Sequence, residues 1–422
     1  MAFVQVNAVS ALTGKNARAG GRCVSFLPRT AWTGDRWAMG RRGSLNSSWR
    51  PVRAGRAVVG AQSVGRSGLV CRDTTIIVNN PTGGHAEIGL HLAQQMLAVG
   101  HRVAILVTAP REQCAQTQPT AEMIRMAESS AMKSDVDLMF GDPTDPASLT
   151  GLLPPRRPSA GRVAALVDNA SKSAQEAMLL HKYAMGVDAD RYLYVSSCGI
   201  YVPSEQAPFV EGDVVDREIG QAQVESLFRA DKAIPFAAFR PMYVLGPFAN
   251  KHDYTNFFFD RLTRQRPIPL PSSGEAFVSL THAADLARML SCAILASPEL
   301  IGGHAFNAVS PRYITLTGLA DLCHQVVNGK EGGKAPVVYY DAKERGVDPK
   351  KSTGLPFRIA YPFLADPGHA IRQLRWSEAF GRTLHTTLQE CYQAYQNNGL
   401  AKRQVDLSGD DAIMQGAHTV RK

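Results

Sequence analysis

The fold is decided by residues 74–107, which read TTIIVNNPTGGHAEIGLHLAQQMLAVGHRVAILV. The run Thr74–Asn80 is short and rich in β-branched residues, which is typical of a buried strand. A glycine turn follows, and residues Ala86–Val99 place apolar side chains at helical spacing before Gly100. Val103–Val107 predicts a second strand. A strand, a glycine turn, a helix and a strand within about 30 residues make a βαβ unit, which requires a parallel sheet.

Later segments repeat this alternation and predict an α/β fold, a Rossmann-type doubly wound parallel sheet with a smaller mixed α/β C-terminal lobe. Further strands are expected at Val136–Phe140, Val163–Val167, Tyr192–Ser196 and Phe236–Phe239. Residues 110–135 are expected to form a helix and a loop. In the lobe, helices are expected near 254–265, 282–297, 316–327 and 380–396, and strands at Phe277–Leu280 and Val337–Tyr340.

The predicted domains follow from changes along the chain in composition and in the pattern of predicted helices and strands. Residues 1–70 form an N-terminal arm, residues 71–245 a Rossmann-like NAD(P)-binding-type domain, residues 246–405 a C-terminal substrate or RNA lobe, and residues 406–422 a polar tail. No window approaches the 18 uninterrupted apolar residues of a transmembrane helix, so the sequence predicts no membrane span.

Most of the positive charge lies in the N-terminal arm. The chain of 422 residues carries 46 Lys/Arg and 37 Asp/Glu, a net charge of +9. The arm holds eleven of the basic side chains and a single acid, Asp35, which leaves 35 basic and 36 acidic side chains for residues 71–422. A nearly neutral body excludes a protein that coats nucleic acid with a uniformly basic surface, but it leaves room for a local basic patch.

The composition of the arm is typical of an organelle transit peptide, because it is rich in Arg and Ser, poor in acids and without apolar periodicity. Its first residues, Met-Ala-Phe-Val, resemble plastid transit peptides with an early phenylalanine. We therefore predict a location in the plastid (chloroplast) stroma, with cleavage within residues 55–72. A disordered basic tail that binds nucleic acid is the alternative.

The seven cysteines are scattered along the chain, and none forms a Cys-x-x-Cys pair. This spacing argues against a disulfide framework or a zinc site. The sequence instead predicts buried free thiols in a reducing compartment.

The turn after the first strand resembles a dinucleotide-binding turn. Such a turn needs a tight bend, a close approach of the backbone to the pyrophosphate, and close packing of the helix on the strand. Gly83 and Gly89 meet the first and third needs, while Ala86 stands where the middle glycine would be. The candidate cofactor-binding residues are Gly83, Gly84, Ala86, Gly89 and Ser197. His85 and Glu87 are interpreted as surface positions of the first helical turn.

The second predicted strand ends without the acid that reads the ribose hydroxyls of NAD in such folds. Its end reads Val107-Thr-Ala-Pro-Arg111. NAD(P) is therefore a possible cofactor, with Arg111 in reach of the 2′-phosphate of NADP, and a vestigial pocket is the alternative.

Four motifs in order resemble the extended short-chain dehydrogenases/reductases, which include the NAD-dependent epimerases and dehydratases. They are the glycine turn, Gly141-Asp-Pro143, Val195-Ser-Ser-Cys-Gly-Ile-Tyr201 and Arg240-Pro-Met-Tyr-Val-Leu-Gly-Pro247. The resemblance implies a Ser, here Ser197, and a Tyr-x-x-x-Lys pair in which the lysine lowers the pKa of the catalytic tyrosine. Counted back from Glu225, Arg217 stands at the tyrosine position and Gln221 at the lysine position. The usual proton relay for hydride transfer is therefore missing.

Further motifs resemble an atypical plastid branch of this superfamily, the chloroplast stem-loop-binding proteins, and the a-type more than the b-type. They are Asn79–His85, Asp168–Lys172, Val210–Asp213, Phe257–Arg261 and Tyr340–Lys351. The resemblance covers roughly residues 74–415. It implies binding to stem-loop transcripts and ribosomal RNA, a divalent-metal-dependent endoribonuclease activity in RNA processing and stability, association with ribosome or nucleoid-type complexes, and a homo- or hetero-oligomer with a paralogue.

Acidic residues after two predicted strands are candidate ligands of Mg²⁺ or another divalent metal. Asp142 follows the third strand and Asp168 ends the fourth, and ligands of doubly wound sheets bind at the carboxyl ends of the strands. Mg²⁺ prefers one or two carboxylates and retained waters. Asp142 and Asp168 are therefore the candidate metal ligands, and the catalytic candidates are Asp142, Asp168, Asn169 and Lys172. An Asp that contacts adenine or caps a helix is the alternative for each carboxylate.

RNA binding requires phosphate neutralisation and stacking on aromatic rings. The candidate RNA-binding residues are Arg261, Arg264 and Arg266, next to Phe257–Phe259, together with Lys343, Arg345, Lys350 and Lys351. A solvated helix face with its aromatic residues in the core is the alternative.

Three functional hypotheses follow. The first is a plastid RNA-binding protein with metal-dependent endoribonuclease activity. The second is an NAD(P)-dependent sugar-nucleotide epimerase, dehydratase or reductase, which the missing Tyr/Lys pair disfavours. The third is a non-catalytic scaffold for RNA or ribosomes that keeps a dinucleotide only as a structural or redox-sensing ligand.

Overall fold

A computed structural model of the chain describes residues 72–83, 85–152, 161–231, 233–249, 253–329, 333–379, 382–415 and 420–421. Residues Gly68–Lys422 form one compact unit. The predicted transit peptide and Gly84 lie outside the described residues.

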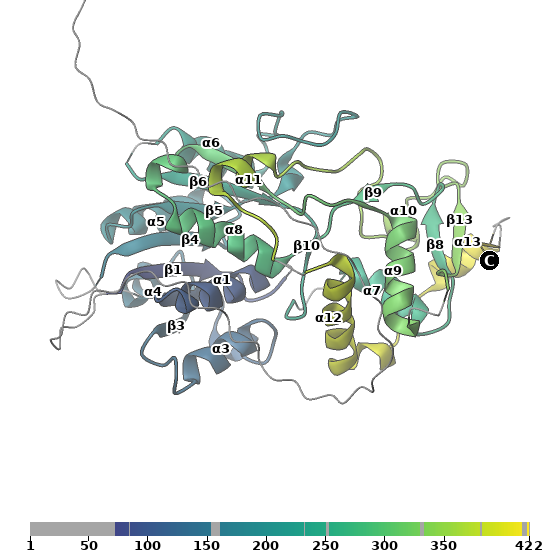
Figure 1. The fold of residues 1–422 in the computed structure, drawn as a ribbon, viewed down its shortest axis with the longest axis horizontal. Coiled ribbons are helices and arrows are strands. Elements are labelled where there is room, and N and C mark those ends of the chain that lie inside the picture. Colours follow the sequence, from purple (N-terminus) through teal and green to yellow (C-terminus); the bar gives the residue numbers. More distant parts are fainter. Residues whose placement is uncertain are drawn as a thin grey trace, which may run out of the picture. The chain divides into compact units, whose positions relative to one another are not determined.

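The centre of the fold is a seven-stranded sheet in which every pair of neighbouring strands is parallel (Figure 1). Its order is β11-β6-β5-β4-β1-β2-β3. The predicted doubly wound fold is therefore confirmed, and four of the six expected strands agree with the structure to within one residue at each end. The strands are β1 (Thr74–Asn79), β2 (Arg102–Val107), β3 (Val136–Phe140), β4 (Val163–Asn169), β5 (Tyr192–Val195), β6 (Phe236–Pro241) and β11 (His304–Ala308).

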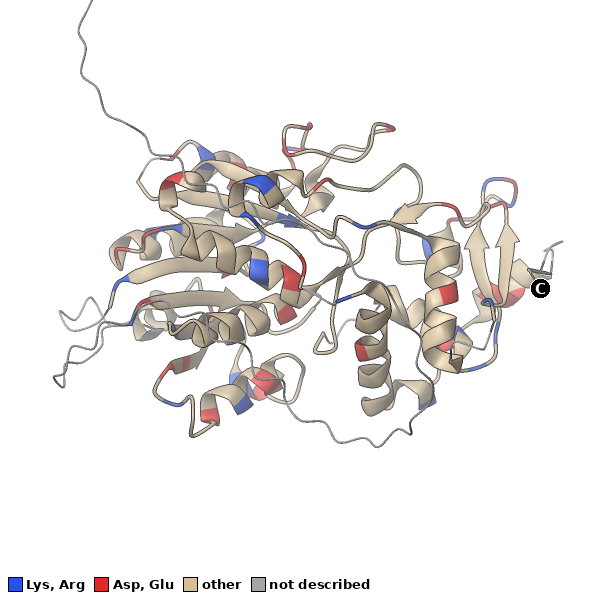
Figure 2. Ribbon diagram, in the orientation of Figure 1, with Lys and Arg blue, Asp and Glu red and all other residues tan. Residues whose placement is uncertain are grey.

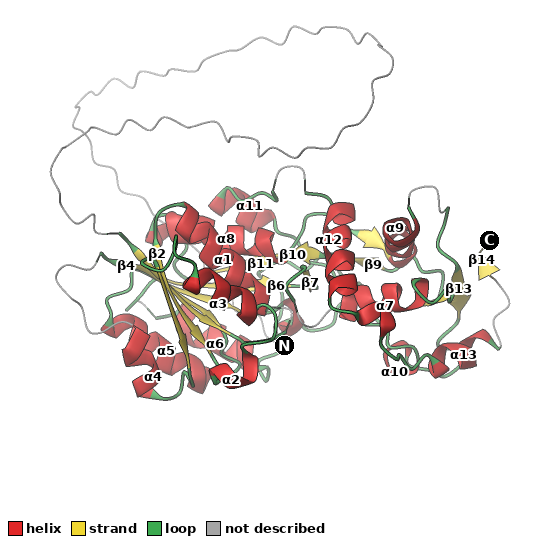
Figure 3. Cartoon of the chain, turned by 90° about the horizontal axis from the view of Figure 1, so that it is seen from below, coloured by secondary structure: helices red, strands yellow, loops and turns green. Residues whose placement is uncertain are grey.

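Helices cover both faces of the sheet (Figure 3). This explains why β1 and β4 are buried along their whole length and carry uninterrupted apolar stretches, Ile76–Val78 and Val163–Val167. One face packs α1 (Ala86–Ala98), α3 (Thr120–Glu128), α8 (Ala283–Leu295) and α11 (Gly368–Leu374). The other packs α4 (Pro146–Leu152), α5 (Ala174–Gly186) and α6 (Gly220–Arg229).

Local sequence sets where several helices begin and end. Gly100 has φ +92° and ends α1, as the sequence predicted, because L side chains rarely adopt this conformation. Ser173 begins α5 by accepting a hydrogen bond from the Glu176 amide. Thr383 and Thr386 form a reciprocal capping box at the start of α12 (Leu384–Asn397).

The chain returns to the sheet after leaving it, so no single cut near residue 245 separates two domains. The strand β11, which the sequence pattern did not reveal, pairs with β6 at the edge of the sheet. Both α8 and α11 also pack on the sheet, although they follow the predicted boundary.

The C-terminal lobe has its own core, built on α7 (Asp253–Leu262), α9 (Leu316–Asn328) and α12. It also holds a three-stranded sheet of β8 (Ile268–Pro271), β13 (Val337–Tyr340) and β14 (Val420–Arg421). Two-residue strands form the pairs β7 (Val244–Leu245) with β10 (Thr281–His282), and β9 (Phe277–Val278) with β12 (Ile314–Thr315). The remaining short helices are α2 (Arg111–Cys114), η1 (Cys198–Ile200), η2 (Pro298–Leu300), α10 (Pro349–Ser352), η4 (Leu400–Lys402) and α13 (Ser408–Met414).

Part of the predicted polar tail is a docked helix. In α13, Asp410 and Ile413 are buried, and Asp410 forms an ion pair of 2.7 Å with Arg261 of α7. The tail prediction fails here because the contact that orders the segment spans 149 residues and leaves no local pattern.

Two further predictions concern residues across the fold. Four of the five described cysteines, Cys114, Cys198, Cys323 and Cys391, are buried free thiols, as their spacing predicted. Burial raises the pKa of each of these thiols, so they are poor nucleophiles. No helix in the described part of the chain is both long and apolar enough to span a bilayer.

Candidate functional site: a basic and aromatic crevice

A cavity of about 580 Å³ opens at the carboxyl ends of the central strands, where doubly wound sheets bind their ligands. Residues from the glycine turn, from the ends of β4, β5 and β6, and from the C-terminal lobe line it. We call this cavity the crevice. Its lining residues are Asn80, Thr82, Gly83, His85, Lys172, Ser197, Gly199, Pro241, Met242, Tyr243, Val244, Asp253, Tyr254, Lys350, Pro356, Phe357, Arg358 and Phe363.

A larger cavity, of about 800 Å³, lies at the opposite edge of the sheet, beside the first residues of β1, β3 and β4. Gly151 and Gly161 line it, and the segment 153–160 between them is outside the described residues. We assign it no function, because the sheet topology favours the carboxyl edge.

The glycine turn has the close packing that the sequence predicted. Gly83 has φ +94° and its carbonyl accepts a hydrogen bond from the Ala86 amide at 3.2 Å. A Cβ atom on Gly89 would lie 2.0 Å from the Asn79 Oδ1 atom, so only glycine lets α1 approach β1 this closely.

Asn169, a predicted catalytic residue, is buried and stabilises the glycine turn through hydrogen bonds. Its Nδ2 atom donates to the Asn79 Oδ1 atom at 2.7 Å and to the His85 carbonyl at 2.9 Å. These bonds join the end of β4 to the end of β1 and the start of α1. Asn169 therefore acts as a positioning residue for the turn in this structure.

The residues that follow β2 are Thr108-Ala-Pro-Arg111. Arg111, the candidate reader of the NADP phosphate, is paired with Glu128 at 2.8 Å and lies 5.7 Å from the ring centre of Phe140. It does not line the crevice.

Asp142 and Asp168 do not fit a shared magnesium ion. The strands β1 and β2 lie between β3 and β4, so three spacings of about 4.8 Å put the two strand ends roughly 14 Å apart. Metal–oxygen bonds of about 2.0–2.6 Å cannot bridge that separation. The described residues also contain no group of three His, Cys, Asp or Glu side chains suited to a metal ion.

Each of these carboxylates has a local structural role. Asp142 is exposed and accepts hydrogen bonds from the Thr144 amide and hydroxyl, which lower the pKa of its carboxyl group. Asp168 is fully buried and accepts from the Tyr192 hydroxyl at 2.6 Å and from the amides of Ala170 and Ser171. It thereby shapes the turn that leads to Lys172.

Lys172 does line the crevice, together with His85 and Ser197. Its ammonium group has no ion-pair partner among the described residues, and partial burial lowers its pKa. Burial, followed by repulsion from Lys172, lowers the pKa of His85 to about 4, so its imidazole is neutral at pH 7. His85 is half-buried, and the surface position predicted for Glu87 is wrong because Glu87 is fully buried.

The positions that would hold the catalytic Tyr/Lys pair belong to Arg217 and Gln221, just before and within α6. The start of α6 packs against the backbone of the turn that carries Lys172, since a Cβ atom on Gly220 would lie 2.1 Å from the Lys172 carbonyl oxygen. Tyr339 and Lys343 also have the Tyr-x-x-x-Lys spacing, but Tyr339 lies on β13 in the C-terminal lobe and contacts the Thr317 hydroxyl.

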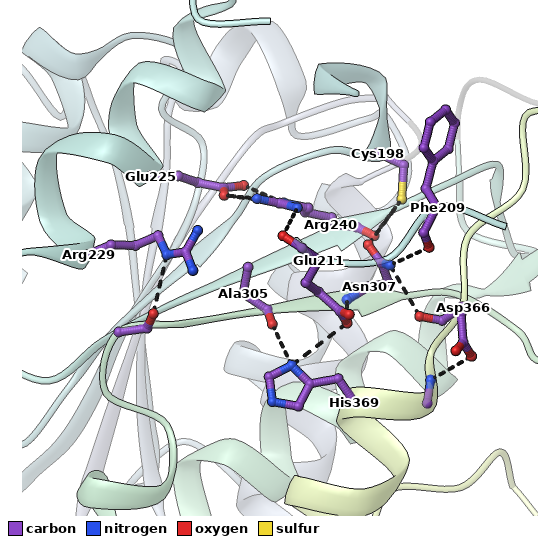
Figure 4. A network of polar contacts seen from close by, with 12 residues as sticks. Cys198, Phe209, Glu211, Glu225, Arg229, Arg240, Ala305, Asn307, Asp366 and His369 are labelled. Atoms are coloured by element: carbon purple, nitrogen blue, oxygen red, sulfur yellow. Dashed lines mark hydrogen bonds and ion pairs between the residues drawn. The ribbon is translucent and has the colours of Figure 1, made fainter. Parts of the chain in front are cut away.

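A buried polar network is centred on the ion pair of Arg240 and Glu225 (Figure 4). Arg240 and Glu225 form a bidentate ion pair, and Arg240 also donates to the Tyr201 hydroxyl at 2.8 Å. Tyr201 in turn donates to Asn307 on β11 at 2.7 Å. The Asn307 backbone amide donates to the Glu211 carboxylate at 2.8 Å, so the network joins β6, β11, α6 and the loop after β5.

The far wall of the crevice is aromatic, and sequence reasoning missed it. Tyr243 has φ +42°, and its hydroxyl accepts a hydrogen bond from the Arg358 amide at 2.8 Å. Its ring lies 5.1 Å from those of Tyr254 and Phe357 and 5.7 Å from that of Phe363. The sequence Leu355-Pro-Phe-Arg-Ile-Ala-Tyr-Pro-Phe363 carried a signal, because it alternates aromatic residues with a cation.

The three arginines predicted to bind RNA have structural partners instead. Arg261 is buried against Asp410, Arg264 donates to the carbonyls of Ala401 and Arg403, and Arg266 pairs with Asp411. The neighbouring residues Phe257–Phe259 lie in the core of the lobe. Arg261 is buried with this aromatic face and cannot contact RNA, while Arg264 and Arg266 follow α7 and stay partly exposed, so their role in RNA binding remains a prediction.

The lysines of the predicted patch remain exposed. Lys343, Lys350 and Lys351 are exposed, while Arg345 donates to the Ile413 carbonyl. Lys350 also lines the crevice. Basic and acidic positions are interspersed along the fold (Figure 2). The larger cavity is lined by four cations and four acids, which are Arg102, Arg111, Lys133, Arg162, Glu128, Asp137, Asp188 and Asp190. The crevice differs because its cations outnumber its acids.

Comparison with known proteins supports the family suggested by the motifs. The model of the NAD dependent epimerase/dehydratase family matches residues 82–308. Chloroplast stem-loop binding protein of 41 kDa b, a chloroplastic protein of Arabidopsis thaliana, is 30% identical over 337 residues, which cover 79% of this chain and 82% of that protein. This relative agrees with the plastid location predicted for this chain. It is a b-type protein, so greater similarity to the a-type stays a prediction.

Solved structures resemble the fold at lower identity. Pal from Bacillus thuringiensis has a TM-score of 0.56 at 18% identity, and covers 77% of this chain and 99% of its own. The epimerase Mth375 from Methanothermobacter thermautotrophicus has a TM-score of 0.57 at 18% identity, with 79% and 95% covered. A dTDP-glucose 4,6-dehydratase from Bacillus anthracis, in complex with NAD, has a TM-score of 0.57 at 13% identity, with 78% and 98% covered. These similarities show the fold.

Proposed function

Since the chain belongs to the NAD dependent epimerase/dehydratase family, together with the chloroplast stem-loop binding protein, we propose that it is a plastid RNA-binding protein acting on stem-loop transcripts and ribosomal RNA. The observation that carries the proposal is the crevice. It keeps the position of the family's ligand site but presents cations and aromatic rings, while the Tyr/Lys proton relay is missing.

The chemistry of the crevice suits an RNA strand. Lys172, Lys350 and Arg358 oppose a single acid, Asp253, along its lining. Cations neutralise phosphates, and aromatic rings stack on bases whatever their identity. The body has almost no net charge, so RNA would be held by this local set rather than by a general electrostatic field.

Catalytic activity is a separate part of the proposal from RNA binding. The resemblance implies metal-dependent endoribonuclease activity in RNA processing and stability. Because Asp142 and Asp168 do not fit a common ion, we assign no step of cleavage to a metal bound between them. Association with ribosomes or nucleoid-type complexes, and an oligomer with a paralogue, remain predictions.

An NAD(P)-dependent enzyme is the second candidate, and the preserved glycine turn favours it. Gly83 and Gly89 keep the geometry in which a dinucleotide could bind. Without the tyrosine and the lysine, such a dinucleotide would serve as a structural or redox-sensing ligand and not as a hydride carrier. A non-catalytic RNA scaffold with a bound dinucleotide would unite the two candidates.

The deciding experiment measures binding and cleavage of a fluorescent plastid 3′ stem-loop RNA by the full chain, in Mg²⁺ and in EDTA. A parallel titration follows NADP⁺. We expect RNA binding that weakens with salt, and metal-dependent cleavage if the endoribonuclease part is right. Tight binding of NADP⁺ without any RNA binding would overturn the proposal in favour of the second candidate.

A matched pair of variants tests the metal hypothesis within the same assay. Asp142→Asn removes an exposed carboxylate that only caps its own turn, and we expect it to leave any Mg²⁺-dependent cleavage unchanged. Asp168→Asn changes a buried hydrogen-bonded carboxylate, so its effect should appear as lost stability. If both variants fold stably and lose cleavage to the same extent, the result would support a metal ion shared by Asp142 and Asp168.

A further inference from the structure

We propose that the crevice holds one unpaired nucleotide of the RNA, with its phosphate between Lys172 and Arg358 and its base against the aromatic wall that includes Tyr254. The inference rests on the proposed RNA-binding function and specifies its substrate: RNA with a loop or bulge is preferred over a continuous duplex.

Two cations approach the crevice from different parts of the chain. Lys172 follows the end of β4, and its ammonium group has no ion-pair partner among the described residues. Arg358 belongs to the C-terminal lobe, yet a Cβ atom on Gly199 would lie 3.6 Å from its Nη2 atom and 3.0 Å from the Ser197 Oγ atom. The guanidinium therefore reaches the loop after β5, on the side of the crevice where Ser197 lies.

Contacts within the lobe hold Arg358 in this place. Its Cζ atom lies 4.8 Å from the ring centre of Phe363, its Nη1 atom donates to the Tyr361 hydroxyl at 3.2 Å, and its amide donates to Tyr243. A guanidinium fixed in this way loses little conformational entropy when it binds a phosphate, and its donors can form two parallel bonds to phosphate oxygens.

Tyr254 is the ring of the aromatic wall available to a base. Phe357, Phe363 and Tyr243 are buried against one another, while Tyr254 is half-buried and lines the crevice beside them. Its ring stacks on Phe357 with centroids 5.7 Å apart and an interplanar angle of 27°. A base placed against this pair would extend the stack, and such stacking contributes about 1–3 kcal/mol per base.

The size of the crevice explains the preference for an unpaired nucleotide. About 580 Å³ is the scale of a pocket for one small ligand. In an A-form duplex the bases are paired inside the helix and their faces are covered by neighbouring bases. A loop or bulge can turn a base outward, so only an unpaired nucleotide can bring its base and phosphate into this space together.

A dinucleotide also carries a base and phosphates that would fit the crevice, so the test must distinguish RNA from a dinucleotide. It uses the full chain and three probes: a stem capped by an unpaired loop, a blunt duplex of the same stem, and NADP⁺. The variants are Lys172→Gln, Arg358→Gln and Tyr254→Leu. Lys182→Gln is the matched control, because Lys182 is exposed on α5 and does not line the crevice.

We expect the full chain to bind the hairpin at least tenfold more tightly than the duplex. Each crevice variant should weaken hairpin binding about tenfold, and Lys172→Gln and Arg358→Gln should each reduce the salt slope by about one, as the loss of one phosphate contact does. Binding of the duplex should change little, and the control should match the unaltered chain. Circular dichroism melting confirms that each variant is folded.

Three results would overturn the inference. Equal affinity for hairpin and duplex would show that RNA lies outside the crevice, and the proposed function would survive. Unchanged hairpin binding in all crevice variants, with NADP⁺ binding lost, would assign the crevice to a dinucleotide. The absence of binding to either RNA would reject the proposed function itself.

Discussion

The carboxylate of Glu87 occupies the space that the missing side chain of Gly246 leaves open. A Cβ atom on Gly246 would lie 2.1 Å from the Glu87 Oε1 atom. Glu87 is fully buried in the first turn of α1, and its Oε1 atom pairs with His91 at 3.0 Å. The glycine turn is thus fitted to the loop after β7, where the chain leaves the sheet for the C-terminal lobe.

We predict that Gly246→Ala lowers the free energy of unfolding by about 1–3 kcal/mol, because the added methyl group must displace a buried carboxylate. Urea denaturation followed by circular dichroism measures the change. Gly186→Ala is the control, since a Cβ atom there meets nothing within 4 Å, and its effect should stay within about 1 kcal/mol. Equal stability of the two variants would show that Glu87 moves aside freely.

The buried pair of Glu225 and Arg240 gives a second prediction. Both side chains are almost fully buried, so Glu225→Gln leaves an uncompensated guanidinium in the core. We expect a loss of about 3–5 kcal/mol in the free energy of unfolding. Glu128→Gln, in the exposed pair with Arg111, should change it by less than about 1 kcal/mol. A similar small effect at both positions would mean that water reaches the network of Figure 4.

Arg261 is predicted to stabilise the lobe without contacting RNA. Its guanidinium is buried against Asp410 of α13, so Asp410→Asn should lower the melting temperature and expose α13 to limited proteolysis. RNA affinity of the folded Asp410→Asn protein should be unchanged at a temperature well below melting. A large loss of RNA affinity without loss of stability would contradict this prediction and would indicate that Arg261 takes part in RNA binding.

His85 is predicted to make stability fall in mild acid. Its folded-state pKa of about 4 is below the ordinary value of 6.5, so between these values the unfolded chain binds a proton that the folded chain excludes. Its contribution to stability is fully present above about pH 6.5 and is lost as the pH falls toward 4. Urea midpoints at pH 7 and pH 5 should therefore differ less in His85→Gln than in the unaltered chain. An identical drop in both would place the acid sensitivity elsewhere.

Much of the candidate site could not be read from the sequence, for a reason that Asp142 and Asp168 illustrate. Both follow strands at the carboxyl edge, and the sequence indicated this correctly. Their separation depends on strand order, and β1 and β2 lie between them. Sequence position does not record which strands are neighbours across a crossover, so residues at the same edge of a sheet can still lie far apart.

The sequence by itself determined the local elements and their class. Period and composition are local, so the run from Thr74 to Val107 was enough to establish the βαβ unit, and Gly83 and Gly89 marked the turn within it. It also indicated the missing proton relay, because Arg217 and Gln221 are a matter of residue type at a fixed spacing.

Only the tertiary structure decided which charged groups face solvent and which face the core. Arg261 and Lys350 are both cations of the C-terminal lobe, but one is buried against Asp410 and the other lines the crevice. A buried charge needs a partner, and that partner is supplied by a segment 149 residues away. The crevice is likewise formed by Lys172 and Arg358, which are brought together only when the lobe packs against the end of the sheet.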